Sequence, residues 1–222
     1  MESHVIARIQ PRADERSRIV EAATIVCRQY GPLKTNVADI ARLIGKSPAS
    51  VYNVFPSKAA ILDAVAASFF ETRLCFTPSA ANGPTSTTGR LKNTTLEQHR
   101  LVLQARDNDP QMFKLMALAA EANWPSYKQH LKRLEAAVAE LILAGVATKE
   151  FATPKIEVAA ACFCVSISVL LDPRIVEALP SSRCEASASE LALFAIAALT
   201  RKAKYRERDR AKGYQAYRTA DD

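Results

Sequence analysis

The stretch that most constrains the fold is residues 36–58, NVADIARLIGKSPASVYNVFPSK. It holds two short segments with apolar residues at helical spacing. Asn36 and Ser47 are residue types that cap helices, and Pro48 suits the first helical position after Ser47. Gly45, between the two segments, can adopt a positive φ. This pattern predicts a helix-turn-helix, a motif whose second helix commonly enters a DNA major groove.

The composition predicts a mostly helical protein. Apolar residues make up 49% of the 222, glycines number only 6, and alternating Val/Ile/Thr runs are nearly absent. The net charge of +7 suits nucleic acid or a membrane surface, although a merely basic soluble protein would carry it too. The longest apolar run, residues 158–171, is too short to span a bilayer. We therefore expect no membrane partner and, because the first residues lack an apolar signal core, a cytoplasmic protein.

The sequence points to no catalytic residue, no metal site and no cofactor. It has no Gly-rich phosphate loop, nucleophile elbow or paired-carboxylate pattern. Its five cysteines are odd in number and scattered among apolar residues, which favours free buried thiols over disulfides. Cys162 and Cys164 lie two apart on a predicted helix and so point roughly 200° apart, which argues against a simple paired metal site.

The helix-turn-helix lies in a predicted DNA-binding domain, residues 1–75, followed by a helical domain over 76–204 and a basic tail over 205–222. The parts expected in the first domain are an arm over 1–13, a helix over 13–30, the motif, and a bridging helix over about 57–74. A Pro/Ser/Thr/Gly-rich stretch, 77–89, is expected to be a loop. The helices expected after it span about 90–107, 110–123, 125–144 (ended by Gly145), 154–171 and 183–204.

These predictions define an all-α fold. An N-terminal three-helix DNA-binding head with the helix-turn-helix is bridged by a fourth helix to a C-terminal helical body. We do not expect head and body to be mechanically independent, because the bridging helix is long enough to belong to both.

The N-terminal third resembles the TetR (tetracycline-repressor-like) family of transcriptional regulators. The resemblance covers about 50 residues. It rests on Tyr30-Gly31, Val37, Asp39-Ile40-Ala41, Gly45, Ser47, Val51-Tyr52, Phe55-Pro56-Ser57-Lys58 and Leu62. It implies a homodimeric regulator whose helical body binds a small molecule and dimerises, but the bodies of this family diverge too much to indicate which ligand.

Two positions depart from the family pattern. Pro48 stands where many members carry a lysine or arginine, and Lys46 stands where a small apolar residue is usual. The second motif helix therefore has no cationic side chain, which disfavours bidentate reading of guanine. Small side chains and DNA shape are the expected means of sequence recognition.

Eight residues are candidate DNA contacts. The phosphate candidates are Asn36, Lys46, Tyr52, Asn53 and Lys58, and the candidates for base edges are Pro48, Ala49 and Ser50. Two alternatives remain open: Tyr52 as a partly buried aromatic residue, and Lys58 as a solvated lysine in the first turn of its helix. Val37, Ile40, Val51 and Phe55 are expected to be core residues.

The body offers candidates for a ligand pocket and for a dimer interface. An apolar pocket is suggested by Met112, Phe113, Met116, Trp124, Cys162 and Phe163, although for any one of them ordinary core packing is the stronger interpretation. The last two long predicted helices are rich in small residues, which suits a self-complementary four-helix interface; an intrachain core is the alternative.

The leading hypothesis is a homodimeric DNA-binding repressor released by a small apolar or amphipathic ligand. One alternative is a helical enzyme or ligand carrier that uses the head only for packing. Another is a redox sensor that works through Cys27, Cys75 or Cys184.

Overall fold

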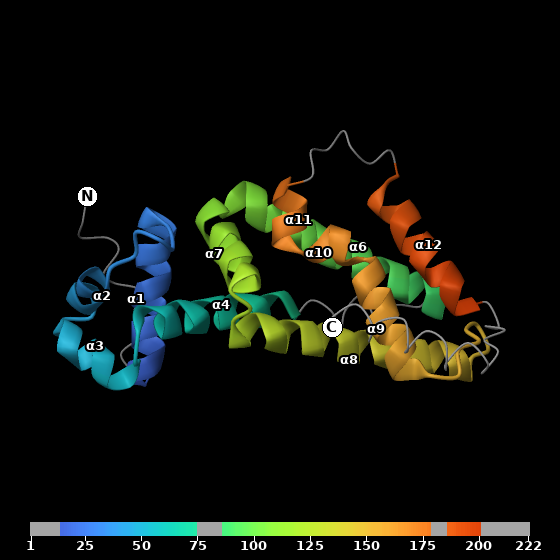
Figure 1. Ribbon diagram of the computed structural model, residues 1–222, viewed down its shortest axis with the longest axis horizontal. Coiled ribbons are helices and arrows are strands. Elements are labelled where there is room, and N and C mark those ends of the chain that lie inside the picture. The colour runs from blue at the N-terminus through green and yellow to red at the C-terminus, as the bar shows by residue number, and fades with distance from the viewer. Residues whose placement is uncertain (1–13, 75–85, 179–185, 201–222) are drawn as a thin grey trace, which may run out of the picture.

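The computed structural model describes residues 14–74, 86–178 and 186–200. These residues form eleven helices and no β-strand, which confirms the all-α prediction. The molecule is elongated, with a small head of three helices at one end and a larger helical body at the other (Figure 1). None of the helices in the described ranges is both long and apolar enough to cross a membrane.

The head consists of α1 (Glu15–Tyr30), α2 (Val37–Leu43) and α3 (Pro48–Val54). The predicted caps are confirmed: Asn36 Oδ1 accepts from the Ala38 N–H at 3.1 Å, and Ser47 Oγ accepts from the Ser50 N–H at 3.2 Å. Gly45 has φ 67°, in the left-handed region that glycine tolerates. The sequence therefore defined both ends of the helix-turn-helix.

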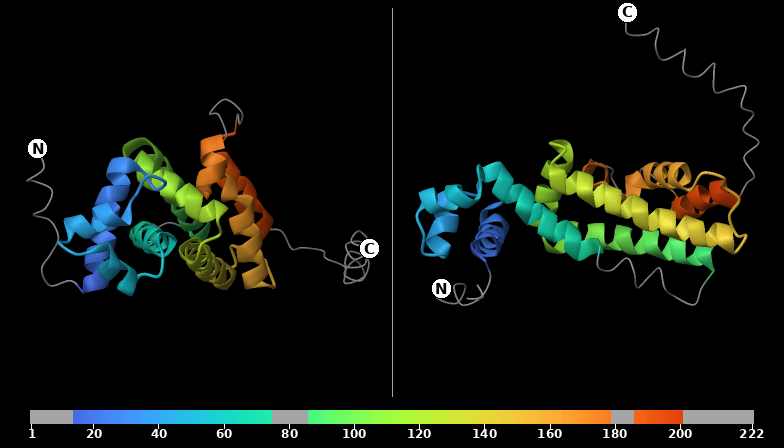
Figure 2. Two further views of the ribbon diagram at one scale, coloured as in Figure 1. Left: turned by 60° about the vertical axis from the view of Figure 1, so that its left-hand side comes forward. Right: turned by 90° about the horizontal axis from the view of Figure 1, so that it is seen from below.

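The bridging helix is α4 (Lys58–Leu74), which begins beside α1 and lies along α8 (Pro125–Ala147) of the body (Figures 1 and 2). One continuous apolar core includes residues of α1–α4 and also of α6 (Thr87–Asn108), α7 (Pro110–Glu121) and α8. The backbone N–H of Ser126 also donates to the Asp63 carboxylate at 3.1 Å, which ties α8 to α4. The head is therefore packed on the body rather than tethered to it.

The rest of the body contains α9 (Ile156–Ser166), α10 (Ser168–Leu171), α11 (Pro173–Ala178) and α12 (Ala188–Thr200). A second core is formed between α6, α8, α9 and α12. Predicted segments 1–13 and 205–222 lie outside the described residues, as does most of the predicted loop 77–89.

Several predicted helix ends differ from the structure, and contacts with distant residues account for two of them. The helix expected from residue 90 begins at Thr87, because Ser86 caps it and Glu150 accepts from the backbone N–H groups of Thr87 and Thr88, both at 2.9 Å. Gly145 does not end α8, which continues to Ala147. A Cβ on Gly145 would lie 2.2 Å from the Phe151 ring, so this glycine makes room for an aromatic side chain.

Other differences arise from tertiary packing. The helix expected over 154–171 is divided at Ile167 into α9 and α10, and the residues that follow form a further helix, α11.

Candidate nucleic-acid interface and ligand cavity

The second motif helix, α3, is held by its apolar side and leaves its other side open. Val51 and the following Phe55 are buried in the core that α3 shares with α1, as predicted. The guanidinium of Arg16 lies over the Phe55 ring at 4.2 Å and adds a cation–π contact. The exposed side of α3 carries Pro48, Ala49, Tyr52 and Asn53. None of these exposed side chains of α3 is charged, as the sequence predicted.

Ser50 and Asn36 serve the ends of their helices. Ser50 is partly exposed, and its hydroxyl lies 2.9 Å from that of Ser47, so one hydroxyl donates to the other. Asn36 is exposed, and its side-chain oxygen is engaged in the cap of α2. The amide NH₂ of Asn36 is a separate donor.

The two lysines proposed as phosphate contacts have intramolecular partners. Lys46 Nζ lies 3.5 Å from the Glu15 carboxylate, and both side chains are about half exposed. Such a surface ion pair contributes about 0–1 kcal/mol, so a phosphate can displace it at little cost. Lys58 Nζ donates to the Leu33 carbonyl at 2.9 Å. This bond uses one of its three N–H groups, and two remain for another acceptor.

Sequence reasoning missed two cations of the head. The Arg42 side chain, in the last turn of α2, is 76% exposed and pairs with Asp39 one turn earlier. Arg16 is exposed on α1, where it covers Phe55. Their charge was visible in the sequence, but their position on the head surface depends on how α1 packs across the motif.

The six predicted pocket residues lie in different parts of the described body. Met112, Phe113 and Met116 are buried in the core shared with the head, and Trp124 packs against that core. Phe163 belongs to the second core, whereas Cys162 is exposed. A shared pocket for these residues stays a prediction, because helix periodicity identifies buried faces but does not reveal where facing helices leave space.

A cavity of about 430 Å³ lies elsewhere in the body, between α4, α8, α9, α10 and α11. This volume is within the range of small-molecule sites. Its lining residues are Phe70, Tyr127, His130, Leu131, Leu134, Glu135, Ala161, Cys164, Val165, Ser168, Leu171, Asp172, Pro173, Arg174 and Ile175. Phe70 and His130 stack with ring centroids 4.7 Å apart and form an aromatic wall.

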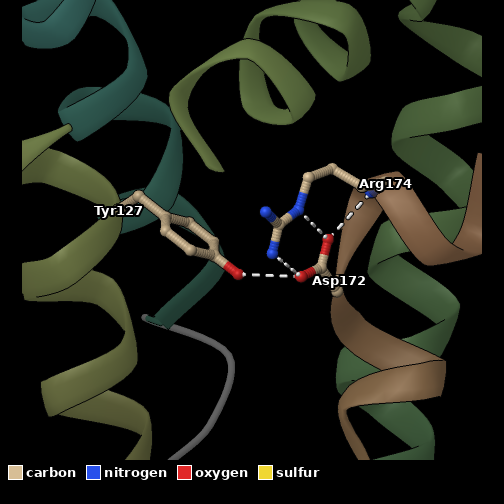
Figure 3. A network of polar contacts seen from close by, with 3 residues as sticks. All are labelled: Tyr127, Asp172 and Arg174. Atoms are coloured by element: carbon tan, nitrogen blue, oxygen red, sulfur yellow. Dashed lines mark hydrogen bonds and ion pairs between the residues drawn. The ribbon is translucent and has the colours of Figure 1, made fainter. Parts of the chain in front are cut away.

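A polar network lies on the cavity wall (Figure 3). The Tyr127 hydroxyl donates to Asp172 Oδ2 at 3.2 Å, across from α8 to the start of α11. Arg174 donates to the same carboxylate through its backbone N–H at 2.9 Å, Nε at 3.0 Å and Nη2 at 2.6 Å. The network lies in the lining of the cavity and ties the turn between α10 and α11 to α8.

The electrostatics of this network suit binding rather than proton transfer. Burial, and then the charge and hydrogen bond of Asp172, raise the pKa of Tyr127 to about 12. Burial also acts to raise the pKa of Asp172, but the hydrogen bonds and charge of Arg174 outweigh it and hold that pKa below its usual range. The pKa values of both groups are thus shifted away from neutral pH, and a general acid or base works best when its pKa lies near the working pH.

Two of the described cysteines, Cys27 and Cys164, have pKa values raised above the ordinary value of a thiol. Burial raises the pKa of Cys27. Burial, and then the charge of Glu135, raise the pKa of Cys164 to about 12. Thiolate is the reactive form, so Cys27 is poorly suited to redox sensing. Cys75 and Cys184 lie outside the described residues.

Comparison with known proteins identifies the family. Residues 19–65 match the bacterial regulatory proteins of the tetR family, and residues 87–192 match the tetracyclin repressor-like C-terminal domain. No functionally curated protein matches the chain in sequence.

Solved structures with the same fold cover most of the chain. A TetR/AcrR family regulator from Thermobifida fusca is 25% identical, with a TM-score of 0.57, and the match covers 88% of this chain and 100% of that one. The fatty acid degradation regulator FadR from Bacillus halodurans is 16% identical, with a TM-score of 0.59 and coverage of 89% and 100%. RolR without ligand is 15% identical, with a TM-score of 0.61 and coverage of 82% and 89%. With both of its parts matched in order, the chain belongs to the TetR family of DNA-binding transcriptional regulators.

Proposed function

We propose that this regulator is a homodimeric repressor whose grip on DNA is released by a small molecule bound in the body cavity. The observation that carries the proposal is the position of Tyr127. Its ring belongs to the core shared with the head, and the same side chain lines the cavity and bonds Asp172. A ligand that moves Tyr127 thus acts directly on the packing that orients the head.

Pro48, Ala49 and Ser50, at the start of α3, are proposed to meet base edges in the major groove. Tyr52, Asn53, Asn36, Lys46 and Lys58 are proposed to contact phosphates. The exposed, uncharged side of α3 supports this division, because it carries no charged side chain that would be drawn to phosphate instead of the base edges. The flanking residues Lys46 and Lys58 supply positive charge for the phosphates. Affinity for DNA then comes mainly from contacts with the phosphate backbone, and sequence specificity comes from small side chains and DNA shape.

A second copy is proposed to cover one side of α9 and α12. Val158 and Val165 on α9 are 56% and 74% exposed, and Leu193 and Phe194 on α12 are 44% and 81% exposed. Cys162, Ala197 and Ala198 are exposed on the same two helices. Large apolar groups exposed on neighbouring helices mark interaction sites, and small residues between them let helices approach closely. Two heads joined in this way would read two half-sites.

The ligand is proposed to release DNA by changing how the two heads are placed relative to each other. A ligand between α4, α8 and α11 favours one arrangement of α8 against α4, and α4 carries the change to the head. The heads of the dimer then no longer match adjacent major grooves. The structural neighbour RolR has also been solved in complex with resorcinol, which supports a small-molecule site in a body of this shape.

The test begins with enrichment of genomic DNA fragments on the purified protein. Light scattering should give the mass of a dimer, and a mobility shift with an enriched fragment should show binding that a cavity ligand reverses. A monomer that still binds the fragment tightly would overturn the dimer. Binding unchanged when ligand occupies the cavity would overturn release. Activation of the adjoining gene would overturn repression.

A further inference from the structure

The charges around the cavity do not balance. Three of the described lining residues carry a formal charge at neutral pH: Glu135, Asp172 and Arg174. His130 also lines the cavity and is counted as neutral, as histidine is in the formal charge of the whole chain. The sum is one net negative charge.

Arg174, which carries the one positive charge in this sum, is already paired with Asp172. Asp172 accepts three hydrogen bonds from Arg174 and one from Tyr127, which fills about four acceptor sites on its two oxygens. The two charges of this pair cancel at close range. Arg174 is therefore a poor anchor for an acidic ligand, which would also lie close to the Asp172 carboxylate.

Glu135 is the charge left over. It lies on α8, partly exposed, among the residues that line the cavity. Within the described part of the chain it forms no ion pair and no hydrogen bond. It faces the partly buried Cys164 of α9, which lines the same cavity, and its charge helps to raise the pKa of that thiol.

The walls around these charges are apolar. Aliphatic and aromatic side chains cover most of the lining: Phe70, Leu131, Leu134, Val165, Leu171 and Ile175. A ligand must therefore bring an apolar body together with a group that satisfies one carboxylate.

We infer that the cavity binds a small monovalent organic cation, an amine or ammonium with an apolar body, whose counter-ion is Glu135. The apolar body packs on the Phe70–His130 wall, and the charged head lies toward α9. An anionic ligand is disfavoured by the net charge of the site. The regulatory meaning of this inference rests on the proposed release of DNA, but the binding preference does not.

The test compares three probes that share one aromatic ring and alkyl chain: phenylbutylamine, phenylbutanol and phenylbutyrate. Calorimetric titration of the full chain at neutral pH should show the amine binding at least about tenfold more tightly than the alcohol, a difference of about 1.4 kcal/mol. Phenylbutyrate should bind most weakly. Equal affinity for amine and alcohol, preference for the acid, or no binding by any probe would overturn the inference.

Variants assign the preference to Glu135. Glu135→Gln should lower amine affinity by about tenfold and leave alcohol affinity unchanged. Glu135→Lys should reverse the order in favour of phenylbutyrate. Glu140→Gln, at an exposed position on the same helix that does not line the cavity, should change nothing. An amine preference that survives both Glu135 substitutions would overturn the assignment.

A mobility shift with the same probes separates this inference from the proposed function. Amine binding that depends on Glu135 but leaves DNA bound would support the ligand class and contradict release. Release by phenylbutanol alone would support the proposed function and contradict the cation.

Discussion

The Arg28 guanidinium bonds the Asp109 carboxylate at 2.9 Å and joins the last turn of α1 in the head to the residue that precedes α7 in the body. Close by, Gly31 ends α1 against the Gln111 side chain, whose Oε1 lies where a Cβ would come within 2.6 Å. The head thus has a second attachment to the body besides α4.

Breaking this attachment should affect regulation more than stability. Arg28→Ala should cost at most about 1 kcal/mol of unfolding free energy, because the pair lies at the surface and the Arg28 side chain is 54% exposed. It should change the ligand concentration needed to release DNA, because α1 would then follow α4 alone. Urea unfolding and mobility shifts measure the two effects, with Arg100→Ala, from an ion pair within α6, as the control. An identical release curve would show that the attachment is passive.

The contact between Glu150, which follows α8, and the first residues of α6 should be sensitive to acid. The backbone N–H groups of Thr88 and Thr87 lower the pKa of Glu150 from 4.5 to about 2. Because the folded-state pKa is the lower one, the stabilisation is complete above pH 4.5 and is lost as the pH falls toward 2. Thermal unfolding of Glu150→Gln should show less dependence on pH in this window than the natural chain. Glu140→Gln should retain the full dependence.

Gly145 should be needed for full stability of the protein, although it lies inside α8. Alanine is the better helix former, but its Cβ would meet the Phe151 ring at 2.2 Å. We expect Gly145→Ala to destabilise the protein by about 1–3 kcal/mol, as overpacking does. Gly145→Ala with Phe151→Leu should recover part of the loss, which urea unfolding of both variants would show. Additive losses would mean that another contact is responsible.

The proposed dimer face can be tested with one charge. Phe194→Glu should give a monomer by light scattering and weaken operator binding, because a single head would have to bind alone. Leu33→Glu, at a highly exposed site in the head, should leave the dimer intact. Cys162 offers a second measurement: its exposed thiol should react faster with maleimide in the Phe194→Glu variant than in the natural chain. Equal labelling rates would count against the face.

DNA contacts of two kinds should behave differently. Tyr52→Ala and Lys58→Ala should weaken binding to all operator sequences, and Lys58→Ala should reduce the salt slope by about one. Ser50→Ala should instead alter the preferred bases in a selection experiment. Lys132→Ala, an exposed cation on α8, should have no effect on binding. Melting curves must accompany Lys58→Ala, because its bond to the Leu33 carbonyl is also lost.

The sequence predicted the features that depend on neighbours along the chain. Caps at Asn36 and Ser47, the turn at Gly45 and the burial of Val51 and Phe55 were all foreseen, because capping and periodicity are local. The contact roles of the head residues remain predictions.

Features that depend on distant partners were not foreseen. Gly145 resembles a helix stop until Phe151 folds over it, and Thr87 resembles loop until Glu150 reaches its backbone. The cavity between α4, α8 and α11 was not foreseen for the same reason. Its polar wall joins Tyr127 to a carboxylate 45 residues later, and no spacing rule reports such a meeting.

The core that runs from α1 through α4 to α7 has a consequence for how the protein opens. Amide protons in α1 and in α7 should exchange with solvent at one shared free energy, since neither helix can detach without exposing the other. A fragment that ends at Leu74 would leave Phe70 without the rings of Tyr127 and His130 that pack against it. Such a fragment should be only partly folded, and the DNA-reading end of this regulator is in that sense completed by its body.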